Sequence, residues 1–216
     1  MKTKKYIVLS ILFLLPITVY LFFATGVNNF VKLPTITENI TELTDFKNLD
    51  GDSVQLKNRI TILGFFGKEV TNKKANAFNL AHKIYKKNYQ FDEFQFVILI
   101  DSSQINEAKA LKEQIKEIAD PVNYQFAFGT PKDIEAVFNS LHTPGRLNDN
   151  LAIDWVFIID KEGNLRGRND DEDTGILYGY NAADYAEINN KMSDDVKVVL
   201  AEYRLALKKY TSDRQI

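Results

Sequence analysis

Two short segments of this 216-residue chain, Arg59 to Phe66 (RITILGFF) and Phe94 to Ile100 (FQFVILI), are almost continuously apolar. Such runs are typical of strands that are buried on both faces of a sheet. Between them, from about Asn72 to Lys87, apolar residues recur at helical spacing. A strand, a helix and a strand in this order predict a parallel pair joined by a right-handed crossover.

The rest of the pattern extends this unit with a charged helix, a short strand, a second helix, a strand hairpin and a closing helix. These elements are expected, in order, at about Ile105 to Ile118, Tyr124 to Phe128, Thr130 to Leu141, Trp155 to Asp160 with Leu165 to Arg168, and Asp194 to Lys209. A parallel unit followed by an antiparallel hairpin and a helix is the thioredoxin pattern. We therefore expect an α/β fold, a thioredoxin-like mixed sheet with flanking helices.

Three local patterns refine this prediction. Phe46 to Leu56 indicates a hairpin, because Asp50-Gly51 can supply the positive φ angles of a two-residue turn. Asn169 to Tyr180 is acidic and is expected to be irregular. Ser193 is expected to cap the closing helix.

The N-terminal segment is apolar enough to cross a membrane. After Lys2, Lys4 and Lys5, the 20 residues from Tyr6 to Thr25 carry no charge. At about 1.5 Å per residue, such a helix spans roughly 30 Å, the thickness of a bilayer core. The lysines are expected to stay cytoplasmic, which predicts a single pass through the inner membrane and a periplasmic domain.

The chain is therefore expected to have three parts: a signal-anchor transmembrane helix over residues 1–26, a tether over 27–43 and one domain over 44–210. The alternative for the first part is a cleaved signal peptide, with Ala24-Thr25-Gly26 as an imperfect cleavage site. The apolar run is longer than the ~7–15 residues of a typical signal core, which favours the anchor.

The sequence contains no cysteine. This excludes disulfides, thiol redox chemistry, iron–sulfur clusters and cysteine-ligated metals. Without the three N-terminal lysines, the chain has 24 basic and 29 acidic residues, a net charge of −5. Such a mildly acidic surface argues against nucleic acid as a partner, because binding to phosphates needs a clustered basic face.

Three segments of the domain carry a likeness to known proteins. They are the Asp50-Gly51 hairpin with the strand up to Gly67, the segment from Gly129-Thr130-Pro131 to Val137, and the segment from Phe157 through Asp160-Lys-Glu-Gly163 to Arg166. Their order resembles the Sco/SenC family of membrane-tethered thioredoxin-fold proteins, over about residues 44 to 168. The resemblance implies a setting in the assembly of the copper site of cytochrome oxidase.

The active residues of that family do not carry over to this chain. The resemblance places the two family cysteines near Thr71 and Ala75, and the copper-ligating histidine near Ala152, with Asp154 close by. Threonine and alanine offer no soft donor for monovalent copper. We therefore expect no catalytic residue, no cofactor and no metal at these positions.

The remaining polar residues form weaker candidates. His82 and His142, the only histidines of the sequence, lie outside any base-orienting pattern. Asp170, Asp171 and Asp173 are weak candidates for binding a cation, although the order of ligands does not follow a calcium-binding loop. A charge run of this kind is more often a solvated loop.

Two functions remain open from the sequence. The first is a non-catalytic accessory or docking protein, bound to the membrane by its N-terminal helix and to a protein partner in respiratory complex assembly. The second is a cysteine-free enzyme, or a metal- or ligand-binding domain, that uses the loop Lys68 to Thr71 and the acidic loop Asp170 to Asp173. A deep pocket with converging carboxylates would favour the second function. An interaction domain unrelated to respiration is a third possibility.

Overall fold

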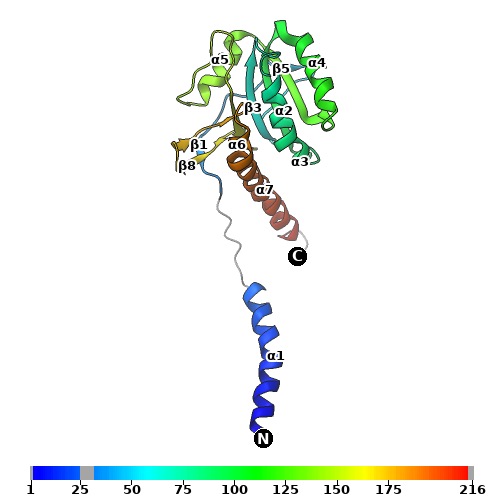
Figure 1. Ribbon diagram of the computed structural model, residues 1–216, viewed down its shortest axis with the longest axis vertical. Coiled ribbons are helices and arrows are strands. Elements are labelled where there is room, and N and C mark those ends of the chain that lie inside the picture. Colours follow the sequence, from blue (N-terminus) through cyan, green and yellow to red (C-terminus); the bar gives the residue numbers. More distant parts are fainter. Residues whose placement is uncertain (1, 25–31, 214–216) are drawn as a thin grey trace. The chain divides into compact units, whose positions relative to one another are not determined.

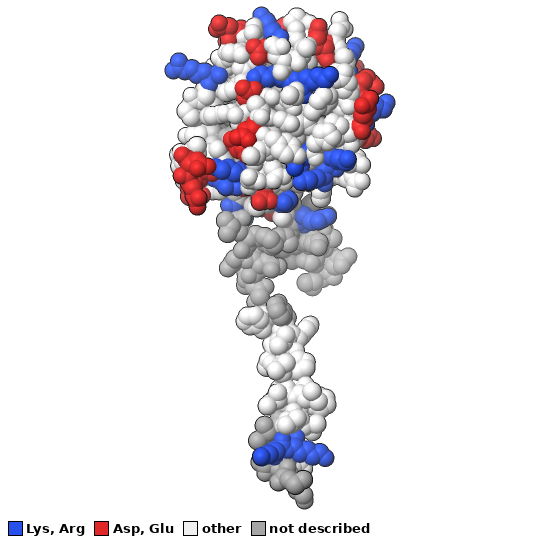
Figure 2. Space-filling view, viewed as in Figure 1, with Lys and Arg blue, Asp and Glu red and all other residues white. Residues whose placement is uncertain are grey.

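The structure, a computed structural model, describes residues 2–24 and 32–213, and the chain forms two compact units, 1–31 and 32–216 (Figure 1). In the first unit, α1 (Lys2–Ala24) is one helix with Pro16 in its interior. From Lys4 to Phe22 its mean hydropathy is 2.0, so it is long and apolar enough to cross a membrane. Figure 2 shows basic side chains at one end of this helix and uncharged ones along the rest that is described.

The second unit is built on an eight-stranded mixed sheet with β3 (Ile60–Gly67) at its centre. On one side, β4 (Phe94–Asp101) and β5 (Tyr124–Gly129) run parallel to β3, and β2 (Lys47–Asn48) closes this edge antiparallel to β5. On the other side follow β6 (Trp155–Ile159), β7 (Leu165–Arg166) and β1 (Thr35–Thr37), each antiparallel to its neighbour. The short β10 (Tyr180–Asn181) also pairs with β6.

Helices connect these strands in the predicted order. The first crossover is a continuous helical segment made of α2 (Lys74–Leu80), a π-helical turn (Ala81–Tyr85) and α3 (Lys86–Asn88). It is followed by α4 (Ile105–Lys116) and α5 (Pro131–Ser140), and the chain closes with α6 (Tyr185–Glu187), a π-helical turn (Ile188–Met192) and α7 (Ser193–Asp213). The strand-helix-strand unit and the β6–β7 hairpin are thus confirmed.

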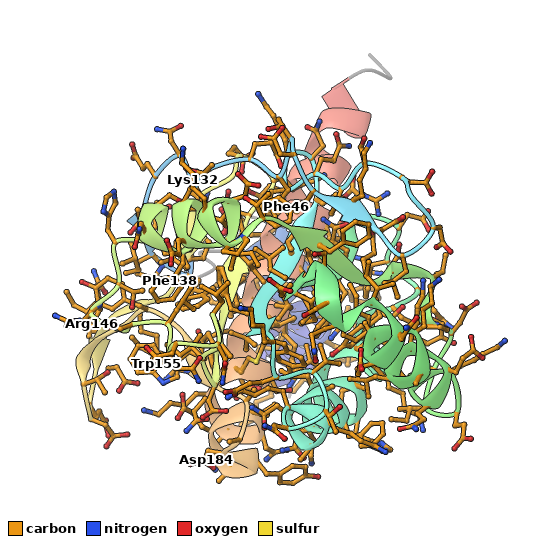
Figure 3. All side chains as sticks on the ribbon, turned by 90° about the horizontal axis from the view of Figure 1, so that it is seen from above. Phe46, Lys132, Phe138, Arg146, Trp155 and Asp184 are labelled. Atoms are coloured by element: carbon orange, nitrogen blue, oxygen red, sulfur yellow. The ribbon has the colours of Figure 1, made fainter. Side chains whose placement is uncertain are left out.

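The helices cover the sheet on both faces because its central strands are apolar on both. Ile62 and Phe66 of β3 join the core beneath α2, α4 and α7, whereas Leu63 and Phe65 join the core beneath α5. On α5, Phe138 is buried against this second core and Lys132 lies on the opposite, solvent-facing side (Figure 3). The continuous apolar pattern of β3 is therefore explained by burial on both sides.

The predicted tether, residues 27–43, needs a corrected boundary. Residues 27–31 lie outside the described residues, but β1 pairs with β7, with Thr35 opposite Arg166. The side chains of Leu33, Ile40 and Leu43 are buried. The segment therefore belongs to the domain from Lys32 onward, and its short strand has no periodicity long enough to be recognised alone.

The chain folds back at Asp50-Gly51 as predicted, but the hairpin is minimal: the amide of Asn48 donates to the carbonyl of Asp52 at 2.9 Å. Gly51 has a φ of 89°, whereas Asp50 is not in the positive φ region, so the turn is not the expected type. Lys47 forms one isolated antiparallel bridge to Ser53, and β2 also pairs with β5.

The segment 169–180 is more regular than expected. Here β8 (Arg168–Asp171) and β9 (Gly175–Leu177) form a separate two-stranded antiparallel ribbon. Figure 2 shows acidic side chains gathered on the side of the domain where Figure 1 places β8.

The cap of the final helical segment lies earlier than predicted. Ser193 is inside a continuous helical run, and the N-cap is Asp184, whose Oδ1 accepts the amides of Ala186 at 2.8 Å and Glu187 at 3.2 Å. An aspartate is as good a cap as a serine, and tertiary packing extends the helix back to it.

Candidate functional site

The loop after β3 begins at Gly67, where the chain passes close to the segment 148–154. Gly67 has a φ of 47°, and a Cβ atom there would lie 2.0 Å from the carbonyl oxygen of Asn150. The same oxygen accepts a hydrogen bond from the amide of Lys68 at 2.8 Å. Only glycine permits this approach, which brings the start of α2 to a loop far along the chain.

The positions that the resemblance assigned to the ligands of that family lie around this junction. Thr71 and Ala75 are exposed at the N-terminal end of α2, and Ala152 is buried in the segment 148–154. The amide of Ala152 donates to Asn148 Oδ1 at 3.0 Å. Within residues 2–24 and 32–213, no three His, Cys, Asp or Glu side chains are grouped so that they could hold a metal ion.

A cluster of polar side chains joins the two segments at this place. Lys73 Nζ donates to Asp154 Oδ1 at 2.6 Å and lies 4.0 Å from Glu69 Oε2. Asn76 Nδ2 donates to the same oxygen of Asp154 at 2.7 Å. Lys73 and Asn76 are only 8% and 6% exposed, so their polar groups are satisfied inside the protein. We call Glu69, Lys73, Asn76, Asn148, Asn150 and Asp154 the Lys73 cluster.

The carboxylate of Glu69 completes the link from the other direction. Its Oε1 accepts hydrogen bonds from Asn148 Nδ2 at 3.1 Å and from Asn150 Nδ2 at 2.8 Å. Two carboxylates, Glu69 and Asp154, thus each bond to a side chain of the opposite segment. The loop before α2 and the segment 148–154 are therefore fastened together by side chains as well as by the backbone contact at Gly67.

The cluster places one cation, Lys73, between two carboxylates, Glu69 and Asp154. Burial raises the pKa of Asp154, but the hydrogen bonds from Lys73 and Asn76 outweigh burial and hold that pKa below its ordinary value. Asp154 therefore stays ionised at neutral pH and remains a counter-ion for Lys73. The ammonium group of Lys73 is thus held as the partner of these carboxylates.

Sequence reasoning located part of this cluster. It placed Asp154 beside the lost histidine position and singled out the loop Lys68 to Thr71, but it did not single out Lys73 or Asn76. Lys73 stands directly before Lys74, which is exposed, and nothing in the sequence distinguishes the buried lysine from the exposed one.

The acidic residues of the β8–β9 ribbon are paired with a lysine from the π-helical turn Ile188–Met192. Lys191 Nζ donates to both oxygens of Asp171, at 2.9 and 2.8 Å, and to Asp173 at 2.7 Å. The hydrogen bond from Lys191 keeps the pKa of Asp171 below its ordinary value, and the pKa of Lys191 is raised in turn. Asp170 is exposed at the edge of the ribbon. An internal ion pair thus stands where a cation site was predicted at Asp170, Asp171 and Asp173.

A second carboxylate fixes the ribbon to the final helix. Asp195 accepts hydrogen bonds from Arg168 Nε at 2.7 Å and from the hydroxyl of Tyr180 at 2.6 Å. Burial and the neighbouring Asp195 raise the pKa of Tyr180, so its hydroxyl remains a donor. These hydrogen bonds hold the ribbon against α7.

The two histidines are not part of any such cluster. His82 is exposed on the π-helical turn, and His142 is exposed in the loop after α5 with a φ of 50°. Among the described residues, no hydrogen bond to either imidazole ring is found. Neither side chain is therefore oriented as a base or a ligand would be.

Comparisons with known proteins agree with this architecture. No protein-family model and no curated protein matches the sequence. Among solved structures, BsSco, a member of the Sco family of cytochrome c oxidase assembly proteins, matches with a TM-score of 0.53 at 14% identity, covering 78% of this chain and 98% of BsSco. The chain has a Sco-like thioredoxin fold.

Two further structures share the fold. A candidate electron transfer protein from Aquifex aeolicus VF5 matches with a TM-score of 0.54 at 12% identity, covering 76% of this chain and 98% of that protein. A candidate protein disulfide isomerase from Bacteroides thetaiotaomicron matches with a TM-score of 0.51 at 17% identity, covering 79% and 95%. These likenesses confirm the predicted thioredoxin-like sheet and its resemblance to Sco proteins.

Proposed function

We propose that this chain is a non-catalytic accessory or docking protein that uses the Sco-like thioredoxin fold as a scaffold. The Lys73 cluster carries the proposal. Lys73, which stands in the chain between Thr71 and Ala75, is buried with its Nζ 2.6 Å from Asp154 Oδ1, so the polar groups next to these positions are bonded within the protein. With no cysteine in the sequence, the scaffold remains and the thiol chemistry does not.

We further propose that α1 anchors the chain in the inner membrane by a single pass, with the domain on the periplasmic side. The apolar stretch from Lys4 to Phe22 and the N-terminal lysines support this arrangement. The fold shared with BsSco, a cytochrome c oxidase assembly protein, supports a partner in respiratory complex assembly. This setting rests on analogy of fold.

The alternative of a cysteine-free enzyme or ligand-binding domain has less support. Three carboxylates of its two loops are engaged internally, Glu69 with Asn148 and Asn150, and Asp171 and Asp173 with Lys191, whereas Asp170 and Glu172 are exposed. Carboxylates that are already paired in this way do not converge on a vacant site.

The proposal is tested by isolating the tagged full-length chain from native membranes and identifying the proteins that accompany it. The matched control is residues 1–31 fused to an unrelated soluble domain, which keeps the predicted anchor and removes the scaffold. We expect oxidase subunits or copper-handling proteins to be enriched only with the full chain. Their absence would contradict the respiratory setting.

A second measurement tests the non-catalytic part of the proposal. The purified full-length chain is titrated with Cu(I) and assayed with a dithiol substrate. We expect neither stoichiometric Cu(I) binding nor turnover. A tight one-to-one copper complex, or oxidation of the dithiol, would contradict the proposal.

A further inference from the structure

The helices α2 and α4 lie side by side on one face of the sheet (Figure 1). A groove is formed between them. It consists of two hollows of about 180 Å³ and about 300 Å³ that share Gln114 on their border. Thr71, Lys74 and Glu107 line the first hollow, and Phe78 and Glu117 line the second. We call the two together the α2–α4 groove. It begins at Thr71, at the edge of the Lys73 cluster.

The floor of the α2–α4 groove is apolar. Val70 and Leu111, with 1% and 4% exposure, line the first hollow. Phe78 and Ile118 are half-buried and line the second. Val70 and Leu111 therefore close the base of the first hollow, and the apolar surface open to a partner comes mainly from Phe78 and Ile118, with Gln114 between the two hollows.

The two walls of the groove carry opposite charges. Lys74 stands on the α2 wall, with its Nζ 5.4 Å from the centre of the Phe78 ring. Glu107 and Glu117 stand on the α4 side. Lys74 and Glu107 border the same hollow, yet neither of them, nor Glu117, forms an ion pair within the described part of the chain. These three charged groups are therefore available to a partner.

We propose that the α2–α4 groove binds an amphipathic helix of a partner protein, with the apolar stripe on the floor, acidic residues toward Lys74 and basic residues toward Glu107 and Glu117. The proposal rests on the proposed docking function and names the surface that performs it. From Lys74 to His82 the α2 wall rises by roughly 12 Å, which matches about two turns of a docked helix. A uniformly charged helix would meet like charge on one wall, so the groove selects a helix of mixed charge.

The test uses three synthetic helical peptides of about 18 residues that share one leucine stripe. The first has glutamates on one flank and lysines on the other, the second has lysines on both flanks, and the third has glutamates on both. Their affinities are measured for the full-length chain in neutral-lipid nanodiscs, with empty nanodiscs as the blank. We expect the mixed peptide to bind about fivefold more tightly than either uniform peptide. This factor is what a few exposed charge pairs contribute to a binding free energy.

Charge reversal identifies the walls. In the double variant Glu107→Lys/Glu117→Lys both walls are basic, so we expect the preference to change to the peptide with glutamates on both flanks. The control is Glu135→Lys, which reverses an exposed charge on α5, on the other face of the sheet, and should leave the order unchanged. Equal binding of the three peptides, no binding, or an unchanged order in the double variant would overturn the proposal.

The same double variant separates this inference from the proposed function. If the peptide preference changes but no respiratory protein accompanies the chain from membranes, the groove is a helix-binding site and the respiratory setting is wrong. If respiratory proteins accompany the wild type and the double variant equally, the setting is supported and the groove is not the surface that binds them.

Discussion

Arg166 of β7 donates a hydrogen bond of 2.8 Å to the carboxylate of Glu202 in α7. The same guanidinium donates to Asp160 at 3.2 Å and, through Nε, to the carbonyl oxygen of Leu33 at 2.8 Å. Glu202 also lies 3.1 Å from Lys32. Since the Arg166 side chain is only 6% exposed, one buried cation holds together the β6–β7 turn, the final helix and the first described residues of the domain.

Replacing this cation should destabilise the domain strongly. Arg166→Met leaves the carboxylates of Asp160 and Glu202 without their shared partner, and a broken buried pair typically costs about 3–5 kcal/mol. The free energy of unfolding of the full-length chain in urea measures this loss. The control Lys197→Met removes an exposed pair with Asp194 and should cost under about 1 kcal/mol. Similar losses in the two variants would contradict a structural role for the Arg166 network.

The same network predicts how stability depends on pH. Burial raises the pKa of Glu202, but the hydrogen bonds from Arg166 and Lys32 dominate and place that pKa below its ordinary value of 4.5. A carboxyl whose pKa is lower in the folded state contributes stability above its unfolded pKa and loses it as pH falls through the folded pKa.

The variant Glu202→Gln isolates this contribution, because glutamine does not titrate. Unfolding free energies measured from about pH 7 down to about pH 3 should fall less steeply in the variant than in the wild type. Parallel profiles for the two proteins would show that Glu202 does not supply this dependence.

Gly67 should tolerate no side chain. In Gly67→Ala, the added Cβ lies 2.0 Å from the carbonyl oxygen of Asn150, which is a clash. The φ of 47° is also unfavourable for alanine. The matched control is Gly51→Ala, where φ is 89° and nothing lies within 4 Å of the added atom. The control should cost about 1 kcal/mol from backbone strain, and Gly67→Ala should cost at least about 2 kcal/mol more, because the junction with residues 148–154 must open. Equal unfolding free energies would contradict the close contact.

Two buried tyrosines should respond in opposite ways to loss of their hydroxyl groups. The hydroxyl of Tyr124 is buried and has no hydrogen-bond partner among the described residues. The ring of Tyr85 packs edge-on against the ring of Tyr124, with 5.2 Å between the ring centres. The hydroxyl of Tyr85 donates to the carbonyl of Asp120 at 2.6 Å and accepts from the amide of Asn123 at 3.1 Å. Burial raises the pKa of Tyr85 to about 12, so this hydroxyl stays protonated at neutral pH.

We therefore expect Tyr124→Phe to leave stability unchanged or to raise it by up to about 1 kcal/mol, because an unpaired polar group leaves the core. Tyr85→Phe should lower stability by about 1–2 kcal/mol, because two bonded backbone groups lose their partner. Thermal or urea unfolding of the two variants measures both effects. A larger loss in Tyr124→Phe than in Tyr85→Phe would contradict the assignment of partners.

Features set by near neighbours in the chain could be predicted from the sequence. The apolar pattern of residues 60–66 and 94–100, the helical spacing between them and the turn at Asp160 to Gly163 each depend on a few adjacent residues. The helix start at Thr130 and Pro131 is equally local: Thr130 accepts from the amide of Asp133 at 3.3 Å, and Asp133 accepts in return from the amide of Thr130 at 3.1 Å. The order of these strands and helices along the chain was enough to predict the thioredoxin-like sheet.

Pairings between distant segments could not be predicted in this way. The strand at Thr35 was assigned to a tether because three residues carry no recognisable period, and it forms only against Arg166 and its neighbour in β7. The acidic residues near Asp171 suggested an ion site because Lys191, which neutralises them, lies on a helix further along the chain.

By itself, the sequence determined the absence of thiol chemistry, since no folding can supply a missing sulfur atom, and it determined the core strands, whose apolar patterns are local. Only the tertiary structure decided what occupies the place beside Thr71, Ala75 and Ala152. The long side chain of Lys73 is compatible with exposure or burial, and it is buried because the fold brings Asp154 to within 2.6 Å of its ammonium group. The partner of a flexible charged side chain depends on which distant segments meet, and that is a property of the folded chain.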